Sequence, residues 1–158
     1  HKFEKNQIAG TGKSNAVVMQ HFYYSKEKSD FKKEKNLKKL GIIHGNAKDV
    51  FKYFKKEKFH LIVGDLPYGI SHGNTIHQME YTGTRNPYEL MELCLPGWYQ
   101  ALKKGGTIAI AWNTYIVSKK KLSRLFVDNN FLLINDQIDY EHMVDKSIKR
   151  DIIIAKKA

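Results

Sequence analysis

An apolar run that ends in an acid and a proline turn is the feature of this sequence that most constrains its fold. Leu61 to Val63 are consecutively apolar, Gly64-Asp65 follows, and Pro67-Tyr68-Gly69 comes directly afterwards. A strand without polar alternation is typical of a parallel sheet that is buried on both faces. Such a strand would carry the Asp65 carboxylate to the carboxyl edge of the sheet, where open α/β sheets bind their ligands.

From residue 40 onward the sequence alternates between strand and helix patterns. The expected strands are Leu40–His44, Phe59–Gly64, Thr107–Trp112, Phe131–Tyr140 and Ile148–Lys156, and the expected helices are Ala47–Lys56, Pro87–Leu102 and Lys119–Asp128. This alternation predicts an α/β fold with a mostly parallel sheet and helices on both of its faces. A short charged loop joins the last two strands, which favours a C-terminal antiparallel hairpin.

Residues 1–39 differ from this pattern and are rich in lysine. They predict a loop, a strand at Val17–Tyr24 and a basic segment from Lys26 to Lys39, so we expect a basic loop and strand insertion at 1–39. Gly10 to Ser14 suggest a phosphate-binding loop, but Gln7 stands where that motif needs glycine, and no apolar strand precedes it. A nucleoside triphosphate site is therefore not expected.

The charge balance favours a polyanionic partner. The chain of 158 residues has 27 Lys and Arg against 16 Asp and Glu, a formal net charge of +11. Such an excess is typical of nucleic-acid-binding proteins, although a merely basic surface explains the charge equally well.

Cysteine and histidine usage limits the chemistry further. Cys94 is the single cysteine, so no internal disulfide forms, and we expect a cytoplasmic protein in a reducing compartment. His72 and His77 lie in one predicted loop without the acids or cysteines that would complete a metal site, so no metal is expected. No apolar run is long enough for a membrane span, so no membrane partner is expected either.

The turn Asp65-Leu66-Pro67-Tyr68 resembles the signature of Rossmann-like S-adenosylmethionine-dependent methyltransferases that modify exocyclic amines of nucleobases, Asp/Asn-Pro-Pro-Tyr/Phe. With Gly69 included, it is most similar to the tRNA guanine-N2 methyltransferase branch and its bacterial relatives. Leu66 replaces the first proline, a position where only the backbone carbonyl is needed. The resemblance covers residues 40–157, including Leu95-Pro96-Gly97-Trp98, Lys104-Gly105-Gly106-Thr107 and Ser147-Ile148-Lys149-Arg150-Asp151.

The resemblance implies a role for each residue of the turn. The Asp65 carboxylate and the Leu66 carbonyl would hold the amine, Pro67 would shape the turn, and Tyr68 would stack on the base. The target base would leave its stack to reach this pocket. The simpler alternative is a surface turn without a function.

Further site residues follow from the same resemblance and from position. His44-Gly45-Asn46-Ala47 resembles the loop that contacts the adenine of the cofactor, S-adenosylmethionine, although an asparagine that caps a helix explains Asn46 equally well. The resemblance also implies that Asp65 borders the cofactor. Trp112-Asn113 ends a strand at the same edge as Asp65. The predicted substrate or RNA contacts are Gly69, His72, Arg85, Asn86, Trp112 and Asn113.

Two features of the family are missing from the sequence. Its members bind the cofactor through a glycine-rich turn after strand one and an acid after strand two, and neither is identifiable here. In the strand order 3-2-1-4-5-7-6 of the family, the Leu40 and Phe59 strands would then face an empty centre. We therefore expect residues 40–158 to be the C-terminal part of a catalytic domain that lacks strands one and two. An upstream segment or a partner chain would complete the sheet.

Three functions remain open at this stage. The leading hypothesis is methylation of an exocyclic amine, with guanine N2 in tRNA as the first target. A DNA adenine-N6 methyltransferase shares the four-residue signature. A non-catalytic RNA-binding module of the same fold would explain the missing glycine-rich turn.

Overall fold

The computed structural model describes residues 2–8, 17–54, 56–68, 86–134 and 137–158. The chain divides into two compact units, residues 1–46 and residues 47–158. The strand predicted over Leu40–His44 is present as Lys38–His44, but it pairs within the first unit. The structure therefore separates the units after residue 46, where the sequence suggested residue 39. The interpretation of the two parts as an insertion and a catalytic domain stays a prediction.

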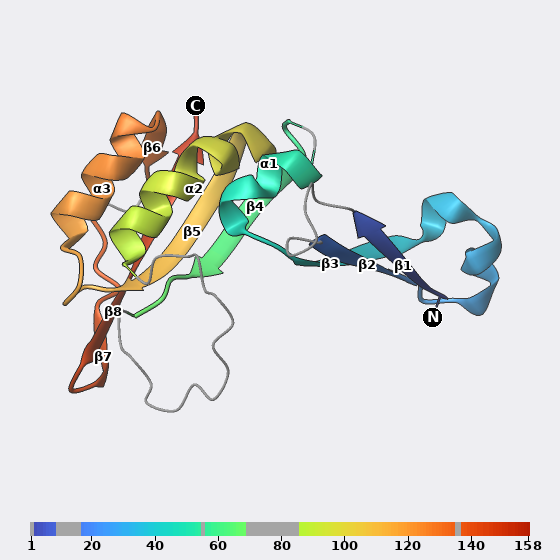
Figure 1. The fold of residues 1–158 in the computed structure, drawn as a ribbon, viewed down its shortest axis with the longest axis horizontal. Coiled ribbons are helices and arrows are strands. Elements are labelled where there is room, and N and C mark those ends of the chain that lie inside the picture. The colour runs from blue at the N-terminus through green and yellow to red at the C-terminus, as the bar shows by residue number, and fades with distance from the viewer. Residues whose placement is uncertain (1, 9–16, 55, 69–85, 135–136) are drawn as a thin grey trace. The chain divides into compact units, whose positions relative to one another are not determined.

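The first unit is a three-stranded antiparallel sheet in the order β1-β2-β3 (Figure 1). Its strands are β1 (Lys2–Ile8), β2 (Val17–Tyr24) and β3 (Lys38–His44), and two short 3-10 helices, η1 (Lys28–Lys32) and η2 (Glu34–Asn36), join β2 to β3. The strand at Val17–Tyr24 is confirmed. The prediction of a loop over residues 2–8 is wrong, because the backbone of β1 pairs with β2 despite its polar sequence.

The second unit contains the main sheet, in the order β4-β5-β8-β6. Its strands are β4 (Phe59–Asp65), β5 (Leu102–Asn113), β6 (Phe131–Leu133), β7 (His142–Asp145) and β8 (Ile148–Lys157), and its helices are η3 (Ala47–Asp49), α1 (Val50–Tyr53), α2 (Pro87–Ala101) and α3 (Lys119–Asp128). β4 pairs with β5 in parallel, whereas β8 is antiparallel to β5, β6 and β7. β4, β5 and β6 thus share one direction, which confirms a mixed α/β fold with a C-terminal antiparallel strand.

Two expected elements are shorter in the structure. The helix expected over residues 47–56 is only η3 followed by the single turn of α1, because Phe54 is extended and packs edge-on against Phe59, with ring centroids 4.7 Å apart. The strand expected over residues 131–140 is only β6, and the chain forms the separate strand β7 after it.

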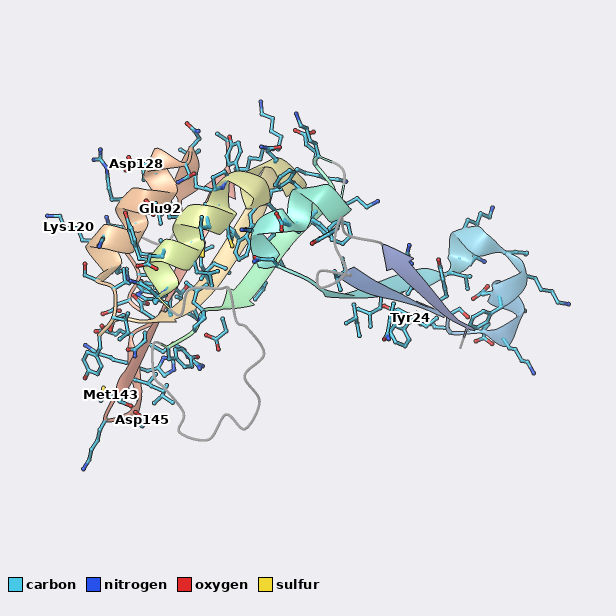
Figure 2. All side chains as sticks on the ribbon, viewed as in Figure 1. Tyr24, Glu92, Lys120, Asp128, Met143 and Asp145 are labelled. Atoms are coloured by element: carbon cyan, nitrogen blue, oxygen red, sulfur yellow. The ribbon has the colours of Figure 1, made fainter. Side chains whose placement is uncertain are left out.

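The core lies between α2, α3 and one face of the sheet (Figure 1). Met91 and Leu95 of α2 and Phe126 of α3 are fully buried against Ile108 and Ile110 of β5. Figure 2 shows Lys120 and Asp128 of α3 on its outer side, as the amphipathic pattern requires.

The opposite face of β4 is exposed. Leu61 and Val63 point there, because side chains alternate along a strand, and they are 56% and 71% exposed. The prediction of helices on both faces is therefore not met within the described ranges. β4 also pairs with β5 alone among these strands, so it forms an edge of the sheet.

Candidate functional site

Asp65 is the last residue of β4, and its carboxylate lies at the carboxyl edge of the parallel strands. Strand alternation places it on the face of Leu61 and Val63, away from α2 and α3. The side chain is 54% exposed. The strand thus delivers an accessible carboxylate to the sheet edge, as the sequence predicts.

The backbone after Asp65 is held in place by the neighbouring strand. The amide N–H of Leu66 donates to the carbonyl of Ala111 in β5 at 2.9 Å. The Leu66 side chain is 5% exposed and belongs to the core. Burial of this side chain explains why leucine is suited to the position, whereas the chemistry expected there needs only the backbone carbonyl.

Tyr68 turns back onto Asp65. Its hydroxyl lies 2.8 Å from Oδ1 and 2.6 Å from Oδ2 of the Asp65 carboxylate and donates to it. Burial raises the pKa of the Tyr68 phenol above its ordinary value, the Asp65 carboxylate raises it further, and the Arg150 guanidinium opposes the rise. The phenol is therefore a neutral hydrogen-bond donor at physiological pH.

Arg150 completes this cluster. The sequence comparison with the family included it in the segment Ser147–Asp151 but gave it no role in the site. Its Nη2 donates to the Tyr68 hydroxyl and lies 3.4 Å from Asp65 Oδ2, and its Cζ lies 5.1 Å from the centroid of the Tyr68 ring. The available signal was topological. An antiparallel strand inserted beside parallel ones begins at their carboxyl edge, so the first residues of β8 had to lie near Asp65.

Asn113 holds the turn to the β7–β8 hairpin. Its side-chain Nδ2 donates to the carbonyls of Tyr68 (3.3 Å) and Ser147 (3.0 Å), and its Oδ1 accepts from the amides of Tyr115 (3.2 Å) and Lys149 (3.1 Å). The residue is fully buried. The structure thus brings the predicted Asn113 to Tyr68, although as a support of the turn.

Trp112 and Asn86 have structural roles in the described chain. The Trp112 ring is fully buried in the core, and its Nε1 donates to the carbonyl of Val117 at 2.8 Å. The ring lies on the core face of the sheet, opposite to the face that carries Asp65, so it does not line a site beside Asp65. Asn86 caps α2, with its Oδ1 accepting from the amide of Tyr88 at 2.9 Å. Contact of Asn86 with a substrate stays a prediction.

The residues predicted to border the cofactor do not all lie in one unit. His44, Gly45 and Asn46 end the first unit, and Ala47 begins the second. The carbonyl of Ala47 accepts from Nε1 of Trp98 at 2.9 Å, near the C-terminal end of α2. Since α2 runs back from the carboxyl edge, Ala47 is not brought to Asp65, and its cofactor contact stays a prediction. Gly69, His72 and Arg85 lie outside the described residues.

A cavity of about 450 Å³ lies between the start of α3, residues 137–141 and the start of β8. Two ion pairs lie in its wall: Lys119 is 3.0 Å from the buried Asp151, and Lys149 pairs with Glu141. The hydrogen bond from Lys149 lowers the pKa of the Glu141 carboxyl. Within the described ranges, no group of three or more His, Cys, Asp or Glu side chains could hold a metal ion, and no helix is long and apolar enough to cross a membrane.

Comparisons with known proteins give likenesses of fold only. No protein-family model matches the chain, and no curated protein matches it. Among solved structures, it is similar to a candidate DNA modification methylase from Thermus thermophilus, with 17% identity, a TM-score of 0.47, and coverage of 72% of this chain and 52% of that one. It is also similar to an S-adenosylmethionine-dependent methyltransferase from Methanosarcina mazei, with 12% identity, a TM-score of 0.46, and coverage of 71% and 64%.

A third similar structure is the 16S rRNA N2 G1207 methyltransferase of T. thermophilus in complex with AdoMet and guanosine. It shares 13% identity and a TM-score of 0.36, and the match covers 67% of this chain and 22% of that one. The chain spans about half the length of the first of these structures. At such scores, the likenesses do not by themselves assign a function.

Proposed function

We propose that this chain is the base-holding part of an S-adenosylmethionine-dependent methyltransferase that modifies an exocyclic amine of a nucleobase, with guanine N2 in tRNA as the first target. The observation that carries this proposal is the cluster at the carboxyl end of β4. An exposed carboxylate, a buried Leu66 that fixes the turn, and an aromatic ring three residues after the acid lie together there.

The chemistry of an exocyclic amine explains why these groups are needed. The amine is a poor nucleophile because its lone pair is delocalised into the ring. Hydrogen bonds from the NH₂ group to the Asp65 carboxylate and the Leu66 carbonyl would localise that lone pair and orient it. Within the described residues, the Leu66 carbonyl accepts no hydrogen bond. The Tyr68 ring would stack on the base, a contact worth about 1–3 kcal/mol.

The residues that the structure describes would supply only some of the contacts that the cofactor needs. S-adenosylmethionine would supply an electrophilic methyl group on a sulfonium cation, and an exposed carboxylate such as Asp65 suits a neighbouring cation. The Ala47 carbonyl, by contrast, is already bonded to Trp98. The remaining contacts, from a glycine-rich turn and a second acid, would come from the proposed upstream segment or partner chain.

The partners belong to the same proposal. The net charge of +11 supports a nucleic-acid substrate, and tRNA is its proposed form. The single cysteine supports a reducing, cytoplasmic location. The exposed Leu61 and Val63 on edge strand β4 support an upstream segment or a partner chain that completes the sheet.

Substitution of Asp65 tests the proposal. In the longest natural product that contains this chain, Asp65→Ala should lower methylation on the order of 100-fold or more, because the amine loses its charged acceptor. The salt dependence of RNA binding rests on phosphate contacts and should stay unchanged. Asp128→Ala removes the same charge on the outer side of α3 and is the matched control.

Two measurements separate the alternatives. Digestion of the treated nucleic acid followed by mass spectrometry identifies the methylated nucleoside; methyladenine in DNA with unmodified tRNA would assign the adenine-N6 activity instead. Calorimetry with S-adenosylmethionine addresses the third candidate. No cofactor binding by the longest product, together with intact RNA binding, would favour a binding module.

A further inference from the structure

Arg150 reaches the Asp65 cluster from the far side of β5. β8 pairs antiparallel to β5 with Arg150 opposite Asn113, two residues from the start of the strand. Its side chain is 30% exposed, and its Nε is buried without a partner among the described residues. A buried donor of this kind costs free energy, so the side chain is held at this position by its other contacts.

The contact with Tyr68 is the stronger of the two that Arg150 makes in the cluster. The distance to the Asp65 carboxylate is 3.4 Å through a single nitrogen, between side chains that are 30% and 54% exposed, and such an ion pair contributes little. The Tyr68 hydroxyl, by contrast, accepts directly from Nη2, and the guanidinium Cζ lies 5.1 Å from the centroid of the Tyr68 ring. Arg150 therefore acts mainly on Tyr68.

The direction of these hydrogen bonds determines where the hydroxyl proton of Tyr68 points. A hydroxyl has one proton to donate, whereas its oxygen can accept. Since a guanidinium only donates, the Tyr68 oxygen must accept from Arg150, and its proton is left for the Asp65 carboxylate. Because the guanidinium donates to the hydroxyl, it lies at the hydroxyl end of the ring.

We propose that Arg150 is a positioning residue that holds the Tyr68 ring beside Asp65 and orients its hydroxyl. This inference rests on the proposed function for its purpose. The geometry itself can be tested without any activity.

A tyrosine titration tests the geometry. Asp65 and Arg150 are the charged groups that face Tyr68 in the described chain. The guanidinium stabilises the phenolate, so Arg150→Met should raise the pKa of Tyr68 further, and Arg150→Lys should restore part of the difference. The measurement is NMR of tyrosines labelled at Cζ, with the Tyr68 signal assigned by Tyr68→Phe. Arg124→Met, which removes an exposed arginine that pairs with Asp128 on the outer side of α3, is the control and should leave the pKa unchanged.

Methylation kinetics then test whether the Arg150 contact with Tyr68 supports methyl transfer. In the longest natural product, Arg150→Met should lower kcat about tenfold or more while the cofactor KM stays the same, because misplacement of a positioning group slows the chemical step. Arg150→Lys keeps the charge and guards against a simple loss of folding. An unchanged Tyr68 pKa in Arg150→Met would overturn the inference, even beside a kinetic defect. Absence of methylation by the unsubstituted protein would instead refute the proposed function, with the Tyr68 titration still deciding the geometry.

Discussion

Asn113 shows how much of the candidate site depends on a single buried amide. It satisfies carbonyls of the Tyr68 turn and the β7–β8 hairpin, two segments far apart in the sequence. Its position after an apolar strand is visible in the sequence, so its presence at the edge could be expected. Its partners could not, because they come from segments that meet only when β8 inserts beside β5.

Cys94 is a residue whose chemistry is set by its surroundings. Burial in α2 raises the pKa of its thiol from 9.0 to about 11, and the charge of Asp49 adds to the rise. We expect native Cys94 to react slowly with a small alkylating agent at pH 8 and quickly once the chain is unfolded in urea, because the thiolate is the reactive form.

The same shift predicts a pH dependence of stability. The folded state favours the neutral thiol. The contribution of the Cys94 thiol to the free energy of unfolding is therefore fully present below pH 9 and is lost as the pH rises towards about 11. The free energy of unfolding should fall over this range, and Cys94→Ala should reduce that fall. An equal fall in both proteins would contradict the assignment.

At the scale of elements, the alternation of strands and helices from Phe59 to Asp128 is predictable from apolar patterning. The other elements depend on how strands pair with one another. β1 forms despite its polar sequence, and residues 131–140 do not form one continuous strand. Local propensity is too weak to place such elements when a neighbouring strand supplies the hydrogen bonds.

The start of β5 gives a prediction at this scale. A Cβ on Gly106 would lie 2.8 Å from the Lys103 carbonyl oxygen and 3.1 Å from that of His60 in β4. Gly106→Ala should therefore lower the free energy of unfolding by about 1–3 kcal/mol, because backbone atoms have to move. Urea denaturation measures the loss. Lys104→Ala, at an exposed neighbour, should change it little, and equal effects of the two substitutions would argue against the close approach.

At the scale of the whole molecule, the exposed face of β4 is the main difference from a parallel sheet that is covered on both faces. Parallel sheets normally have both faces covered. Here α2 and α3 cover one face, and Leu61 and Val63 are exposed on the other. This is the surface that the proposed upstream segment or partner chain would cover.

Val63→Lys tests whether that face is covered in the natural product. In this chain alone, the substitution should change the free energy of unfolding by less than about 0.5 kcal/mol, since the side chain is 71% exposed. In the longest natural product it should cost at least about 2 kcal/mol, because a charge would be buried without a partner. Denaturant titrations of both forms measure the difference. A small effect in both would rule out a covering segment at Val63.

From local patterns of apolar residues and turns, a parallel strand that ends in an acid and is followed by Pro67 and Tyr68 is predictable. The expected burial of that strand on both faces is wrong, because Leu61 and Val63 are exposed. Long-range packing is what places the Tyr68 hydroxyl on Asp65, brings Arg150 to both of them and puts Trp112 in the core. The reason is sheet topology: β8 lies beside β5 and carries Arg150 across about 85 residues of sequence to Asp65. Contacts of that range depend on strand order and register, which no local pattern records.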